Sequence, residues 1–244
     1  MFFCILICSS CSKKSPYGNH IPVAITQIYD ITDTLLLTPS PAPVYSLCDF
    51  PSDIDKQAIF KSVLITDKLL NPCSSITLED GSASDKHNVS GAPHYRKKQV
   101  KWFYDSVQRL IDDFPKEYTG EHPLEYSECY ATISDEIERI MAVPYSRRAV
   151  LVYSDLMENN PEFNFYNPTT QKLIASHPDS VAQSLYKKRP MPDDLRGMRV
   201  YFLFRPKNAH QDRLFQSIIK VYECLLEIRG AKIIVQADCN NITF

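Results

Sequence analysis

The sequence lacks the short motifs that mark several large classes of protein. Beyond the first 11 residues it contains neither a Cys-x-x-Cys pair nor a cysteine–histidine spacing typical of zinc sites. It has no Gly-x-Ser-x-Gly motif, and none of its 6 histidines accompanies a recognisable nucleophile. Its 27 basic residues nearly balance its 29 acidic ones, and no extended basic stripe is present. A zinc protein, a serine hydrolase and a nucleic-acid-binding protein are therefore not expected.

Long apolar runs and internal repeats are absent from the sequence as well. No stretch reaches the roughly 20 apolar residues of a transmembrane helix. The composition is otherwise that of a globular domain, with 44% hydrophobic and 23% charged residues. A chain of 244 residues is long enough for one α/β domain with a substantial core.

The amino terminus resembles a bacterial lipoprotein signal. Eight apolar residues are followed by Ser9, Ser10 and Cys11. The apolar run is too short to span a membrane but suits the central region of a signal peptide. The resemblance implies that residues 1–10 are cleaved, that Cys11 is acylated, and that residues 11–20 tether the protein to a membrane of the cell envelope. The alternative is a secretion signal without a lipid.

The cysteines beyond this signal do not form an obvious framework. They are widely spaced and odd in number, at Cys48, Cys73, Cys129, Cys224 and Cys239. Export would permit disulfides, and Cys48 with Cys73 is the one pair to consider. Cys224 and Cys239 fall in apolar patterns and are expected as small core residues.

Apolar segments alternate between the two-residue period of strands and the 3.6-residue period of helices. Strands are expected at 21–29, 61–67, 74–78, 149–154, 199–204 and 231–237, and helices at 53–60, 95–114, 130–142, 179–188 and 211–228. Four prolines between residues 38 and 51 argue against a helix there, and Gly230 is expected to end the last helix. The alternation predicts one Rossmann-like α/β domain over residues 21–244, with a doubly wound, mostly parallel sheet flanked by helices.

The first expected strand ends in Asp30-Ile31-Thr32-Asp33-Thr34. Alternate residues of an extended segment point the same way, so Asp30, Thr32 and Thr34 can converge on one point. One carboxylate and two hydroxyls suit a small hard cation. The alternative is a turn in which Thr32 or Thr34 caps a following helix.

The strand at 149–154 also ends in a hydroxyl and a carboxylate, Ser154 and Asp155. A buried carboxylate is costly unless it is paired, hydrogen-bonded or bound to metal. Two such strand ends predict two loops that meet at one edge of a parallel sheet, where ligands bind in open α/β folds.

With these two strand ends the chain resembles the von Willebrand factor A family, over about residues 20 to 240. That family carries a metal-ion-dependent adhesion site, built from Asp-x-Ser/Thr-x-Ser/Thr after the first strand. A hydroxyl on a middle loop and an aspartate after the fourth strand complete it. Asp30-x-Thr32-x-Thr34 matches the first element and Asp155 matches the last.

The middle hydroxyl is then expected from Ser127, with Thr132 as its competitor. The resemblance implies that Mg²⁺ or another divalent ion is held by Asp30, Thr32, Thr34, Ser127 and Asp155. Two positions depart from the family pattern, since Asp33 and Leu156 stand where the family has a small residue and a glycine.

Three functions follow from these patterns. The first is a lipid-anchored envelope protein that binds a protein partner, with the metal accepting an acidic side chain of that partner. The second is a metal-free assembly scaffold of the same fold. The third is a phosphatase of the haloacid dehalogenase type with Asp30 as nucleophile. Thr32 stands where such an enzyme needs a general acid, and Asp193 and Asp194 precede a strand instead of following one, so an enzyme is not expected.

Overall fold

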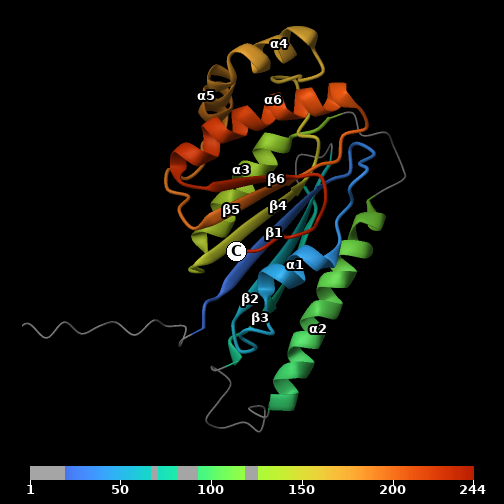
Figure 1. Cartoon of the computed structure of the whole chain (residues 1–244), viewed down its shortest axis with the longest axis vertical. Coiled ribbons are helices and arrows are strands. Elements are labelled where there is room, and N and C mark those ends of the chain that lie inside the picture. Colours follow the sequence, from blue (N-terminus) through green and yellow to red (C-terminus); the bar gives the residue numbers. More distant parts are fainter. Residues whose placement is uncertain (1–19, 67–70, 82–92, 119–125) are drawn as a thin grey trace, which may run out of the picture.

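The computed structural model describes residues 20–66, 71–81, 93–118 and 126–244. Over these ranges the chain forms one α/β domain on a six-stranded sheet in the order β3-β2-β1-β4-β5-β6 (Figure 1). The strands are β1 (Val23–Asp30), β2 (Ala58–Ile65), β3 (Cys73–Leu78), β4 (Arg147–Tyr153), β5 (Met198–Leu203) and β6 (Lys232–Gln236). Only the edge pair β2–β3 is antiparallel among these. The doubly wound, mostly parallel sheet expected from the sequence is confirmed.

Helices cover both faces of this sheet. They are α1 (Pro41–Cys48), α2 (Pro93–Asp112), α3 (Cys129–Ala142), α4 (Pro168–Ser176), α5 (Pro178–Lys188) and α6 (Ala209–Leu226), with single 3₁₀ turns η3 (Phe114–Glu117) and η4 (Glu227–Arg229). On one face, the Tyr222 ring of α6 lies 5.0 Å from the Phe202 ring of β5 and 6.5 Å from the Tyr130 ring of α3. On the other face α1 packs on α2, with the Tyr45 and Tyr104 rings 4.1 Å apart. Figure 1 shows α4 and α5 beyond α6, at the top of the molecule.

Two of the sequence-based helix predictions are wrong. A helix does form in the proline-rich segment, because Pro41 occupies its first turn, where a missing N–H removes no helical hydrogen bond. The helix expected at 53–60 is replaced by turns and the start of β2, since Ala58 already pairs with Val23 of β1 and with Leu78 of β3. Tertiary pairing overrides the local signal there.

Other local predictions are confirmed. Gly230 follows η4 with a φ of 90°, a left-handed conformation that favours glycine. β1 and β4 are buried along most of their length, as expected for central strands of a parallel sheet. Two expectations for the cysteines are not met: Cys48 and Cys73 are free thiols and form no disulfide, and Cys224 is exposed on α6 and not part of the core. None of the helices within the described ranges is long and apolar enough to cross a membrane.

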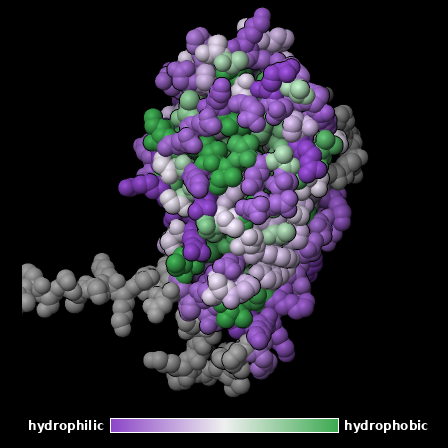
Figure 2. All heavy atoms as spheres, in the orientation of Figure 1, coloured by the Kyte–Doolittle hydropathy of each residue, from purple (hydrophilic) through white to green (hydrophobic). Residues whose placement is uncertain are grey.

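The strand order reverses between β1 and β4, with β2 and β3 on one side and β5 and β6 on the other. In open α/β folds ligands bind beside the carboxyl ends of the strands at such a reversal. Figure 2 shows hydrophilic residues over most of the visible face, with hydrophobic residues grouped where α6 and β6 lie in Figure 1. A ligand site is therefore expected after β1 and β4 and beside α6.

Candidate functional site

Asp30 lies at the reversal of the strand order, and only 1% of the residue is exposed. It ends β1, and Ser154 follows β4. Tyr29 pairs with Tyr153 in parallel register, so the next residue of each strand lies opposite the other. The Ser154 hydroxyl donates to Asp30 Oδ2 at 2.8 Å. The two polar strand ends thus meet, as the sequence predicts.

The Asp30 carboxylate is fully engaged by the protein's own donors. Its Oδ1 accepts the backbone N–H of Thr32 at 3.0 Å and the Thr32 hydroxyl at 2.6 Å. Its Oδ2 accepts the Ser154 hydroxyl and, at 3.6 Å, the Cys129 thiol. Since a carboxylate offers about four acceptor positions, these donors occupy all of them. Burial raises the pKa of Asp30, and the hydrogen bonds from Thr32, Ser154 and Cys129 oppose that rise.

Cys129 also belongs to the site, although the sequence predicts no role for it. Its sulfur lies 3.2 Å from the Ser127 hydroxyl and 3.6 Å from the Ser154 hydroxyl. Burial raises the pKa of this thiol well above its ordinary value, so the thiol keeps its proton and donates to Asp30. Ser127, the expected middle hydroxyl, reaches Asp30 only through this thiol. The one feature of the sequence that could have indicated this role is the position of Cys129, two residues after Ser127.

The remaining threonines of the predicted set lie elsewhere. Thr34 is exposed and its backbone N–H donates to Asp33 Oδ1 at 2.6 Å, and no contact within the described ranges joins it to Asp30. The Thr132 hydroxyl donates to the Glu128 carbonyl at 2.7 Å and accepts from the Asn71 amide. Thr132 is therefore part of α3 and its surroundings, and not the middle hydroxyl.

Asp155 is 8% exposed and lies near enough to Asp30 for the charge of Asp30 to act on it. Its Oδ1 accepts the backbone N–H of Met157 at 3.0 Å. The pKa of Asp155 is raised to about 7, mainly by burial and also by the charges of Asp30 and Asp33, against the opposing effects of the Met157 hydrogen bond and of Lys207. The Asp155 carboxyl therefore titrates near neutral pH.

Leu156 stands after Asp155, where the von Willebrand factor A pattern has a glycine. Its φ is 63°, the left-handed conformation that a leucine adopts at a cost of roughly 1–2 kcal/mol. The side chain is completely buried, which contributes about 1.5–3 kcal/mol. Burial of the side chain thus offsets the strain of the backbone.

A third buried carboxylate, Glu158, fastens this loop to α3. Its Oε1 accepts the backbone N–H of Tyr130, an otherwise unpaired donor in the first turn of that helix. Its Oε2 accepts the Asn160 amide at 3.0 Å. Burial raises the pKa of Glu158 to about 8. The sequence shows Glu158 only as part of a polar loop, because a cap from a distant segment leaves no local pattern.

The arrangement around Asp30 fits a divalent cation poorly. Mg²⁺ prefers a shell of hard oxygen ligands, whereas every acceptor of Asp30 is occupied and a protonated thiol lies beside it. Within the described ranges there is no group of three or more histidine, cysteine, aspartate or glutamate side chains placed to hold a metal. Coordination by Asp30 would require Ser154 or Cys129 to give up its hydrogen bond, so the magnesium site stays a prediction.

A cavity of about 190 Å³ opens at this edge of the sheet. It brings two carboxylates together with aromatic, aliphatic and amide side chains. This cavity, here called the edge cavity, is lined by Asp33, Asp155, Met157, Tyr166, Gln171, Phe204, His210, Gln211, Leu214 and Phe215. These come from the loops after β1 and β4, from the segment around α4, and from the end of β5 and the start of α6. Of these residues, Asp155 is the one for which the sequence predicts a site role.

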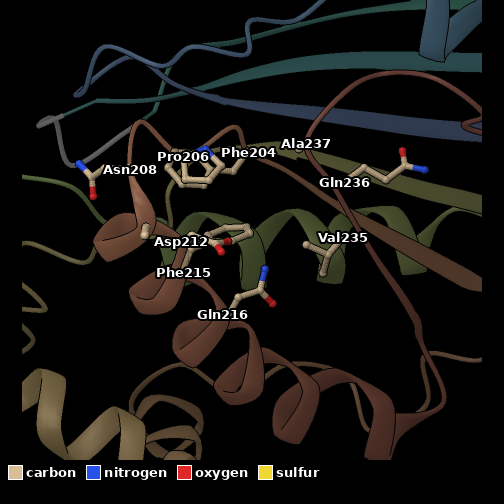
Figure 3. Close-up of a pocket in the computed structure, with 10 residues that line it drawn as sticks. Phe204, Pro206, Asn208, Asp212, Phe215, Gln216, Val235, Gln236 and Ala237 are labelled. Carbon is tan, nitrogen blue, oxygen red and sulfur yellow. The ribbon is translucent and has the colours of Figure 1, made fainter.

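A second, wider cavity of about 400 Å³ adjoins it (Figure 3). Figure 3 shows Phe204 and Pro206 after β5, Asp212, Phe215 and Gln216 on α6, and Val235 and Gln236 at β6. Phe204 and Phe215 line both cavities, with ring centroids 4.8 Å apart. Asp212 is the one carboxylate in this wider lining. The edge cavity is therefore the stronger candidate for recognising charge.

Comparison with known proteins identifies neither a family nor a function for the chain. No family model matches the chain, and no curated protein matches it. Among solved structures, the chain is similar to the D319A mutant of the PilB minor pilin from Streptococcus sanguinis, with 9% identity and a TM-score of 0.49. The alignment covers 93% of this chain and 60% of that one. At this level the likeness carries no information about function.

Proposed function

We propose that the chain is a non-catalytic binding module, anchored to the bacterial envelope through Cys11, whose protein partner binds at the carboxyl edge of the sheet over the edge cavity. The observation that carries the proposal is a hollow lined by two carboxylates, Asp33 and Asp155, at the reversal of the strand order. Cys11 itself lies outside the described residues, so the anchor rests on the sequence pattern alone.

The absence of a free nucleophile at Asp30 supports a binding role over catalysis. Asp30, the candidate phosphoryl acceptor, is buried and its acceptors are occupied by Thr32, Ser154 and Cys129. Asp193 and Asp194 precede β5 and so lie at the opposite edge of the sheet. There Asp193 accepts from the Tyr186 hydroxyl at 2.9 Å, and Asp194 pairs with Arg196 at 2.6 Å.

The metal-free form of the proposal is the one that the geometry supports best. A metal-bridged partner would require Asp30 to exchange an internal hydrogen bond for a cation. The two forms differ in a simple measurement, because a ligand that binds only the folded state raises the melting temperature. We expect millimolar Mg²⁺ to leave the melting temperature unchanged. A rise that disappears in Asp30→Ala would establish the metal-bridged form instead.

The partner-binding edge is tested by photo-crosslinking in the native cells. A benzoylphenylalanine placed at Tyr166, which is 53% exposed and lines the edge cavity, should give an adduct of discrete mass. The matched control is Ile228, which is 81% exposed and precedes β6 at the opposite edge. Adducts at neither position or equally at both would sink the proposal. Magnesium-dependent turnover of p-nitrophenyl phosphate that is lost in Asp30→Asn would replace it with a phosphotransfer enzyme.

A further inference from the structure

The edge cavity combines negative charge with an apolar wall. Asp33 and Asp155 supply the carboxylates, while Phe204, Phe215 and Leu214 supply the wall. Asp155 is more than nine-tenths buried, and its one hydrogen bond, from the Met157 backbone, uses a single oxygen. A buried carboxylate with so little compensation costs free energy until a donor or a cation reaches it.

Among the described residues, no side chain neutralises this pair fully. Lys207 is the cation nearest to Asp33, at 4.0 Å, and its side chain is 40% exposed. That distance is the outer limit of an ion pair, and an exposed pair of this kind contributes little. Asp30 and Asp33 add to the negative potential at Asp155, while Tyr166 and His210 complete the titratable lining.

The helix starts near the cavity do not turn it into an anion site. The amino terminus of α6 would attract an anion through its free N–H groups. The Asn208 side chain already accepts the N–H groups of His210 and Gln211, each at 3.0 Å. In the same way Asn167 accepts the Thr169 N–H of α4 at 2.8 Å. The protein's own amides thus occupy donors that an anion would use.

We propose that the edge cavity receives a lysine or arginine side chain of the partner, whose cationic group binds between Asp33 and Asp155 while its methylene stem lies against Phe204 and Phe215. The inference rests on the proposed function and names the chemistry of its partner. A long cationic side chain buries its stem on apolar surface and keeps its charge at a polar end, and the aromatic ring of Tyr166 beside the carboxylates adds a face that attracts cations. The volume of about 190 Å³ exceeds by several-fold the roughly 30 Å³ that one water occupies.

The test uses the folded full-length protein and small probes that mimic the competing side chains. n-Butylammonium should produce saturable shifts of the backbone amide signals of Met157 and Tyr166 in NMR spectra. n-Butanol, butyrate with Mg²⁺, and inorganic phosphate should bind more weakly. Asp155→Asn, which keeps the acceptor for Met157, should weaken butylammonium binding at least about tenfold, as expected for loss of a charged partner.

The matched control is Asp238→Asn. Asp238 also accepts a backbone N–H two residues on, from Asn240 at 2.8 Å, but it is exposed and lies outside the edge cavity. Its substitution should leave butylammonium binding unchanged. Butanol binding as well as butylammonium, tighter binding of phosphate or of butyrate with Mg²⁺, or no shift with any probe would each overturn the inference.

The two proposals fail in different ways. If Tyr166 gives no crosslink in cells while butylammonium still binds, the cation site stands and the partner-binding function falls. If the crosslink forms with equal yield in wild type and Asp155→Asn, partner binding stands and the cation inference falls.

Discussion

Asp155→Asn should change how the stability of the protein depends on pH. The side-chain oxygen of asparagine can still accept the Met157 N–H, but asparagine does not titrate. In the folded protein the pKa of Asp155 is raised from 3.8 to about 7, so the folded state keeps a proton that the unfolded chain releases. Its favourable contribution is fully present below pH 3.8 and is lost as the pH rises through about 7.

The size of the effect follows from that difference in pKa. Each pH unit between the two values corresponds to about 1.4 kcal/mol. Because each form is only partly ionised near its own pKa, the wild type should lose roughly 3–4 kcal/mol of unfolding free energy between pH 4 and pH 7 through this one carboxyl. Between pH 5 and pH 8 the loss is roughly 2–3 kcal/mol, because it ends near pH 7. Relative to the wild type, the unfolding free energy of Asp155→Asn should therefore increase by that amount between pH 5 and pH 8.

Urea unfolding at pH 5 and at pH 8 measures the effect. Glu158, whose burial also raises its pKa, titrates in both proteins, so the difference between wild type and variant isolates Asp155. Asp238→Asn is again the control and should show no pH-dependent gain, since Asp238 is exposed. If Asp155→Asn and the wild type give parallel curves of stability against pH, the burial argument for Asp155 is refuted.

Two further predictions concern the buried cluster and the amino terminus. Ser154→Ala removes the hydroxyl that donates to Asp30 at 2.8 Å and accepts the Leu156 N–H. Urea unfolding should show that this variant is destabilised by about 1–3 kcal/mol. The control Ser176→Ala should change stability little, because Ser176 is exposed and its hydroxyl bonds only to its own helix. For Cys11, intact mass spectrometry of membrane-fractionated protein should show a mature chain that starts at an acylated cysteine, and soluble protein that retains Met1 would contradict the lipoprotein signal.

The sequence by itself determined the class of fold and one half of the site. Continuous apolar runs, such as residues 149–153 of β4, are typical of strands that are buried on both faces of a parallel sheet, and β1 and β4 are strands of this kind. A hydroxyl and a carboxylate at the ends of those two runs were enough to predict that Asp30 and Asp155 share one edge. Both patterns involve residues that are close together in the sequence, so they can be recognised without the three-dimensional structure.

The tertiary structure decided how those residues act. Cys129 lies 99 residues from Asp30 in the chain, and only the packing of α3 beside β1 makes its thiol a donor to that carboxylate. Glu158 caps α3 from a loop 28 residues away, and the edge cavity gathers residues from segments that the chain order keeps far apart. Hydrogen bonds and burial of this kind depend on distances through space, which the local sequence does not encode.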